Sequence, residues 1–246
     1  MIFSGGFISL TVKIGNFLFR WRSFFPLIFL FFAWKTFITP EVFEKNSPLF
    51  ENFFEAFCFL ISFTGLIIRF IIAGYTPKGT SGRNTRSQKA STLNTSGFYS
   101  IIRHPIYFLG NFPIFLGWLL FTEIWWLIIL GIILFFGYYY FIVKAEDYFL
   151  KETFGETWEA WAKVTPAFYP AFWKKWTPFN TTFNLKKALK NEIPTFFILI
   201  LVYALVDTIR DLITEREIDF FWLSIALLNM GFYLLYKYFI KKFLKY

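Results

Sequence analysis

Residues 106–143 read IYFLGNFPIFLGWLLF, then TE, then IWWLIILGIILFFGYYYFIV. Neither the first run, 106–121, nor the second, 124–143, carries a charged side chain. Apolar runs of about this length are typical of membrane-spanning helices, although the first is short. Because only Thr122 and Glu123 separate the runs, they predict a tight pair of antiparallel helices.

The composition of the whole chain indicates a membrane protein. It has 246 residues, of which 57% are hydrophobic, 25% aromatic and 17% charged. A water-soluble domain of this composition would lack the polar surface to cover itself, and disorder is excluded for the same reason. One cysteine, Cys58, excludes an internal disulfide framework, and one histidine, His104, excludes a histidine-rich metal site. The net charge of +9 is better explained by basic loops on anionic lipid than by nucleic-acid binding.

Long apolar runs predict about six transmembrane helices in an all-α integral membrane protein. Transmembrane β-strands are not expected, because the runs do not alternate apolar and polar residues. We expect one membrane domain over residues 1–246. The predicted spans are 24–38, 53–75, 106–121, 124–143, 194–209 and 218–236.

Lysine and arginine residues predict the orientation. They concentrate at the N-terminus, after the second span, after the fourth span and in the C-terminal tail. These segments hold twenty of them, against three in the opposite loops. An even number of spans separates the four segments, so they share one side, which the positive-inside rule places in the cytoplasm. Both termini are therefore expected to be cytoplasmic, in the inner or plasma membrane if the chain is bacterial.

Polar residues flank the predicted hairpin. Arg103, His104 and Tyr107 stand at its entrance, and Glu146 and Asp147 follow its exit. Because the two ends of a hairpin meet at one membrane face, these five side chains are expected in one neighbourhood. Each also has a structural explanation: arginine and tyrosine are common at membrane interfaces, His-Pro begins helices, and paired acids are often solvated. Their joint order around a hairpin favours a functional site.

This pattern resembles the isoprenylcysteine carboxyl methyltransferase family and its relatives, the phospholipid methyltransferases. The family pattern is a Gly-x-Tyr element, an Arg-His-Pro-x-Tyr element, a helical hairpin, a Glu-Glu pair, a Phe-Gly-x-x-Tyr-x-x-Tyr stretch and closing prolines. The resemblance covers residues 97–170, about a third of the chain. The matching residues are Gly97, Tyr99, Arg103, His104, Pro105, Tyr107, Glu146, Asp147, Phe154, Gly155, Trp158, Trp161, Pro166 and Pro170.

The resemblance implies an enzyme without a Rossmann fold that binds S-adenosylmethionine at its cytoplasmic face. The chain departs from the family pattern at three positions. Asp147 is one methylene shorter than the family's glutamate, and Trp158 and Trp161 keep the aromatic surface of two tyrosines but lose the hydroxyl. Residues 192–246 form an additional two-span region outside the core. The implied cofactor contacts are Tyr99, His104, Pro105, Tyr107, Glu146 and Asp147.

The implied chemistry is methyl transfer from a sulfonium, in which the protein aligns donor and acceptor and excludes water. We expect catalytic roles for Arg103 and Glu146. Acceptor contacts are expected from Arg69, a charge within a predicted span, and from Arg103, Trp158 and Trp161. Arg103 could hold either the anion of the acceptor or the carboxylate of the cofactor.

The expected acceptor is the polar head of a membrane lipid or lipidated molecule. The basic face favours a carboxylate or phosphate oxygen over an amine, and neither a metal nor a nucleic acid is expected. The alternative is a non-enzymatic transport or assembly protein, which would explain the spans and the basic loops. That alternative leaves the ordered motif unexplained, and the chain lacks the internal repeats and midplane polar cluster usual in transporters.

Overall fold

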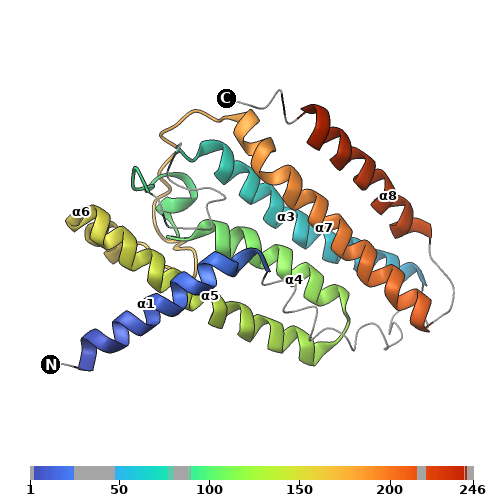
Figure 1. Cartoon of the computed structure of the whole chain (residues 1–246), viewed down its shortest axis with the longest axis horizontal. Helices are drawn as coiled ribbons and strands as arrows, with labels where there is room; N and C mark the ends of the chain where they lie inside the picture. Colours follow the sequence, from blue (N-terminus) through green and yellow to red (C-terminus); the bar gives the residue numbers. More distant parts are fainter. Residues whose placement is uncertain are drawn as a thin grey trace.

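In the computed structural model, residues 3–24, 48–77, 79, 88, 90–214, 220–240 and 242 are described, and every regular element among them is helical (Figure 1). The predicted first span, 24–38, lies outside these residues except for Phe24. The elements in chain order are α1 (Phe3–Trp21), η1 (Arg22–Phe24), α3 (Pro48–Tyr75), η3 (Gly97–Ser100), η4 (Ile106–Asn111), α4 (Phe112–Phe121), α5 (Trp125–Phe154), α6 (Glu156–Val164), α7 (Leu185–Thr214), α8 (Phe220–Leu235) and η5 (Tyr236–Ile240).

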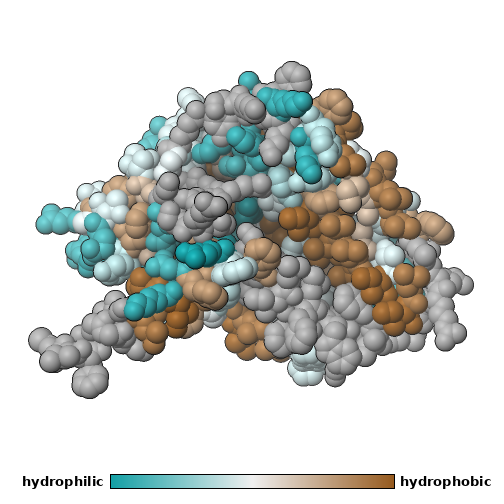
Figure 2. All heavy atoms as spheres, viewed as in Figure 1, coloured by the Kyte–Doolittle hydropathy of each residue, from teal (hydrophilic) through white to brown (hydrophobic). Residues whose placement is uncertain are grey.

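Three of the described helices are long and apolar enough to cross a membrane: Leu49–Tyr75, Trp125–Phe154 and Phe220–Phe239. A shorter apolar helix runs from Ile106 to Phe121. These segments confirm an all-helical protein with apolar helices of membrane length, and the total of six spans stays a prediction. Figure 2 shows hydrophobic residues gathered on the side of α7 and α8, and hydrophilic residues on the side of α6. Exposed phenylalanine and leucine side chains along α3 and α8 fit contact with lipid.

The predicted hairpin is confirmed. Element η4 continues directly into α4, and three residues separate the end of α4 from the start of α5. The Thr122 hydroxyl donates to the Leu119 carbonyl at 2.7 Å, and Glu123 takes a left-handed backbone conformation (φ 56°) that reverses the chain. The α5 helix runs past the expected span end, so the two acidic residues belong to its last turns. Gly155 ends it at φ 52° and ψ −127°, a conformation that favours glycine.

Small residues let the helices of the core approach closely. On α3, Ser62 and Gly65 face Gly110 and Gly117 on η4 and α4, and a side chain at any of these glycines would overlap the opposite helix. The Ser62 hydroxyl donates to the Ile114 carbonyl at 2.9 Å, which ties α3 to α4. Interfaces of this kind are typical of helices in membranes, where van der Waals contact and interhelical hydrogen bonds replace the hydrophobic effect. Similarly, α1 packs on α5.

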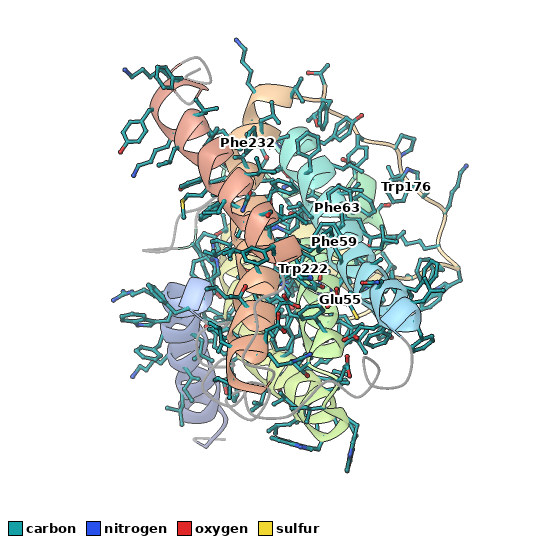
Figure 3. The ribbon with its side chains drawn as sticks, turned by 90° about the vertical axis from the view of Figure 1, so that its right-hand side faces the viewer. Glu55, Phe59, Phe63, Trp176, Trp222 and Phe232 are labelled. Atoms are coloured by element: carbon teal, nitrogen blue, oxygen red, sulfur yellow. The ribbon has the colours of Figure 1, made fainter. Side chains whose placement is uncertain are left out.

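The C-terminal helices complete the bundle. Helix α7 packs between α3 and α8. On α8, Trp222 stacks on Tyr203 of α7 with ring centroids 5.4 Å apart, and its indole N–H donates to Glu55 of α3 at 3.1 Å. Figure 3 shows Glu55 and Phe59 of α3 on the same side of the bundle as Trp222. The Phe121 ring of α4 lies 4.7 Å from Tyr203 and 6.0 Å from Trp222 between ring centroids, so aromatic packing joins α7 and α8 to the hairpin.

The segment before α7 covers the C-terminal end of α3. The Asn184 N–H donates to the Gly74 carbonyl at 3.0 Å, Thr181 donates to the Tyr75 carbonyl, and the buried Lys187 ammonium donates to the Thr76 carbonyl. The last carbonyls of a helix have no partner within it, and a cation beside them is favourable. These contacts fix the start of α7 against the polar end of α3.

Candidate active site

The hairpin begins with a polar, non-helical segment that leads into a wide helical turn. Pro105 precedes η4, and the Phe112 N–H bonds to the Tyr107 carbonyl five residues earlier, which makes η4 a π-helix. Single π turns occur frequently at functional sites. Here Tyr107 and Asn111 both face α5, where the phenol of Tyr107 donates to Glu146 and the amide of Asn111 donates to Tyr139.

His104 lies between the two acidic residues of α5. Its Nδ1 is 3.1 Å from Glu146 Oε2, and its Nε2 is 3.0 Å from Asp147 Oδ1. The second oxygen of Asp147 accepts from Arg103 Nη2 at 2.8 Å, and the second oxygen of Glu146 accepts from the Tyr107 hydroxyl at 2.8 Å. The structure therefore confirms that all five side chains from the two ends of the hairpin share one neighbourhood.

The charges of this cluster balance. His104 is buried, with 5% of its side chain exposed. Burial lowers the pKa of His104, but hydrogen bonds and attraction from Asp147 and Glu146 outweigh it and raise the pKa to about 9. The imidazole is thus a cation at neutral pH and donates from both nitrogens. With Arg103, it compensates the two carboxylates, so the cluster has no net charge.

Helix α6 and the chain after it hold Arg103 in place. Its Nη1 donates to the carbonyls of Ala162 and Thr165 at 3.0 and 3.1 Å, near the end of α6. Its backbone N–H donates to Pro166 at 2.8 Å. Further bonds, from Ala171 to Ile101 and from Gly97 to Thr177, show that residues 166–177 run antiparallel to residues 97–103.

The remaining predicted residues lie around this cluster. Pro105 is fully buried at the start of η4. The Trp161 indole donates to the Tyr99 carbonyl at 3.1 Å, and the Arg103 guanidinium carbon lies over the Trp158 ring, 5.7 Å from its centroid. A small pocket beside Tyr99 is also bordered by Tyr75, Thr76, Asn94, Ser96, Phe179 and Asn180. It lies on the α3 side of η3, and Tyr99 is the one predicted site residue among its described lining.

Arg69 belongs to a second cluster of polar side chains, which is joined to the His104 cluster by a contact between two tyrosine rings. Arg69 pairs with Glu192 of α7, with Nε 2.8 Å from Oε2 and Nη2 3.1 Å from Oε1, and its Nη1 donates to Asn111. The rings of Tyr139 and Tyr107 lie 4.7 Å apart and join the two groups. Sequence reasoning missed Asn111, Tyr139 and Glu192. Asn111 had a usable signal, because it is an amide within an apolar span.

The protonation of His104 makes stability depend on pH. Its pKa of about 9 in the folded protein exceeds the ordinary value of 6.5, so the folded state binds this proton more tightly. The stabilisation is complete below pH 6.5 and is lost as the pH rises through about 9. We therefore expect the thermal unfolding temperature to fall over this range, and a His104→Gln variant to show a flatter profile. Equal profiles for both proteins would contradict the prediction.

Comparison with known proteins supports one family. Residues 56–157 match the family model described as phospholipid methyltransferase, which confirms the resemblance seen in the sequence. The matched segment contains α4 and the cluster around His104, and it excludes Trp158, Trp161 and Glu192. No curated protein and no solved structure matches the chain. The match supports a membrane methyltransferase that acts on lipid-type substrates.

Proposed function

We propose, on the premise of this match, that the protein is an S-adenosylmethionine-dependent methyltransferase that modifies the polar head of a membrane lipid or lipidated acceptor. The observation that carries the proposal is the hydrogen-bonded cluster at the open end of the hairpin. It links His104 to Glu146 and Asp147, with Arg103 and Tyr107 on the outer carboxylate oxygens. A purely structural hairpin has no need of two carboxylates and two cations at its buried ends.

The chemistry of these side chains fits S-adenosylmethionine, which has a cationic sulfonium and ammonium and an anionic carboxylate. Each carboxylate of the cluster accepts two of about four possible hydrogen bonds, so both retain capacity for cationic or hydroxyl groups. Two buried N–H groups, Arg103 Nε and Trp158 Nε1, lack a partner in the described part of the chain and suit an anion. When bound, the cofactor supplies an activated methyl group.

The residues then have distinct roles. We assign Glu146 and Asp147 to the cationic part or the ribose hydroxyls of the cofactor, because carboxylates accept such bonds strongly. His104 orients both acids, since it bonds to each of them. Tyr99, Pro105 and Tyr107 shape the surrounding wall. Arg103 binds an oxyanion, and Arg69, Trp158 and Trp161 contact the acceptor.

The protonation of the cluster favours an oxygen acceptor. A carboxylate or phosphate is already ionised near neutral pH and needs no general base, whereas an alkylammonium group must first lose a proton. His104 is a poor base for that step, because two carboxylates hold it protonated up to about pH 9. We therefore favour transfer to a carboxylate or phosphate oxygen, with the methyl–sulfur bond breaking as the methyl–oxygen bond forms.

The membrane arrangement belongs to the same proposal. We infer six spans with both termini and the cofactor site in the cytoplasm, a methyltransferase core at residues 97–170 and an additional region at residues 192–246. The pair between Arg69 and Glu192 supports a role for the additional region, because it brings α7 to the edge of the core.

Binding of S-adenosylmethionine tests the proposal. The purified full-length protein in detergent would be titrated by calorimetry, beside His104→Ala and Glu146→Ala. We expect saturable binding by the wild type and at least a tenfold loss in both variants, consistent with about 1.5–3 kcal/mol for a hydrogen bond to a charged group. Glu152→Ala, an exposed glutamate on the same helix, is the matched control and should bind like the wild type. Absence of binding by folded wild type would overturn the proposal.

A further inference from the structure

Helix α6 carries two tryptophans whose indole N–H groups differ in their environment. The Trp161 indole donates to the Tyr99 carbonyl at 3.1 Å. The Trp158 indole nitrogen is shielded from solvent, yet it has no hydrogen-bond partner in the described part of the chain. One tryptophan therefore has a structural bond, and the other presents a buried donor.

A second buried donor lies in the neighbouring side chain. Arg103 uses Nη1 for two carbonyls near the end of α6 and Nη2 for Asp147. Its Nε is buried and has no partner among the described residues. The guanidinium carbon lies 5.7 Å from the centroid of the Trp158 ring, so the two donors belong to side chains in direct contact.

Two unpaired buried donors on side chains in contact are unusual in a folded protein. Each loses its hydrogen bonds to water without gaining another, and most buried polar atoms are bonded. Neither group can relieve the cost by changing its protonation, because an indole N–H is only a donor and a guanidinium stays charged. A ligand that supplies acceptors would satisfy both groups, and the positive charge of Arg103 favours an anionic ligand.

We propose that Arg103 Nε–H and Trp158 Nε1–H together bind one oxyanion group, a carboxylate or a phosphate. The inference rests on the proposed function, in which the cofactor carries a carboxylate and the acceptor carries a carboxylate or phosphate. It gives Trp158 a role that its aromatic surface alone does not provide. Where the family pattern has a tyrosine hydroxyl, Trp158 has an indole N–H, which can only donate.

The substitution Trp158→Phe tests the pair, because it removes the N–H and keeps an aromatic ring. Full-length protein in detergent would be titrated with S-adenosylmethionine, with decarboxylated S-adenosylmethionine, and, in the presence of S-adenosylmethionine, with dioctanoyl phosphatidic acid. If the site holds the cofactor carboxylate, Trp158→Phe should weaken the binding of S-adenosylmethionine about tenfold and leave the binding of the decarboxylated compound unchanged. If it holds the acceptor, the binding of phosphatidic acid should weaken about tenfold, and both forms of the cofactor should bind as they do to the wild type.

Trp161→Phe is the matched control for stability and for binding of the cofactor, and not for binding of the acceptor, which Trp161 is itself expected to contact. It should lower the unfolding temperature, because the Tyr99 carbonyl loses its donor, whereas Trp158→Phe breaks no hydrogen bond and should lower the unfolding temperature less. Binding by Trp158→Phe within twofold of the wild type for all three probes would overturn the inference while the proposed function stands. No binding of S-adenosylmethionine by folded wild type would instead remove the proposed function.

Discussion

Replacing Asp147 with alanine should destabilise the protein by about 3 kcal/mol or more and abolish binding of S-adenosylmethionine. Its carboxylate bonds to Arg103 at 2.8 Å and to His104 at 3.0 Å, and only 12% of the side chain is exposed. Removal leaves Arg103 without a carboxylate partner and His104 with Glu146 alone. Losing one partner of a buried ion pair costs more than the pair contributes, because the remaining charge stays buried without compensation.

Thermal unfolding and calorimetry in detergent would measure both effects. Asp147→Glu is the informative partner variant, because it restores the residue found in the family pattern. It keeps the charge while lengthening the side chain by one methylene, so we expect it to retain most of the stability. The exposed Glu152→Ala serves as control on the same helix. An Asp147→Ala protein that unfolds at the wild-type temperature would show that Arg103 and His104 do not depend on this carboxylate.

The centre of the site was predictable because one local element determines it. A hairpin brings its two ends together whatever the rest of the fold does, so residues 43 positions apart, His104 and Asp147, could be placed in one neighbourhood from sequence. The two runs around Thr122 and Glu123 were sufficient for this step. Their catalytic and binding roles remain predictions, because proximity alone does not establish chemistry.

The surroundings of the site were not predictable, since they depend on contacts between distant segments. Glu192 pairs with Arg69 across 123 positions, and no periodicity in either helix indicates a partner. The same limit applies to α6. Both of its tryptophans replace a tyrosine of the family pattern, yet only Trp161 has a hydrogen-bond partner for its indole among the described residues. That difference comes from the packing of η3 against α6 and not from either residue type.

The backbone pairing near the site could not be predicted from the sequence either. Residues 166–177 contain prolines, aromatic residues and lysines, a composition that indicated only an irregular interfacial segment. In the structure, backbone hydrogen bonds hold this segment antiparallel to residues 97–103. Irregular segments lack a periodic pattern, so their partners follow from the positions of the helices that they join.

Replacing Gly117 with leucine should have the largest effect on folding. A Cβ at Gly117 would overlap the Ser62 hydroxyl, the Cys58 carbonyl and the Tyr203 hydroxyl, which come from α3 and α7. A backbone carbonyl cannot move aside as the end of a flexible side chain can, so α4 would have to separate from α3. We expect a loss of about 3 kcal/mol or more, or failure to assemble.

The yield of monodisperse protein in detergent and its unfolding temperature measure this effect. Gly137→Leu on α5 is the matched control, because a Cβ there meets nothing within 4 Å. Leucine has a higher helix propensity than glycine, so the control should be as stable as the wild type or slightly more stable. Since Arg69 and the η4 turn lie along the same interface, a Gly117→Leu protein that does fold should also bind S-adenosylmethionine more weakly. Wild-type yield and stability for Gly117→Leu would show that α3 and α4 do not pack closely at this level.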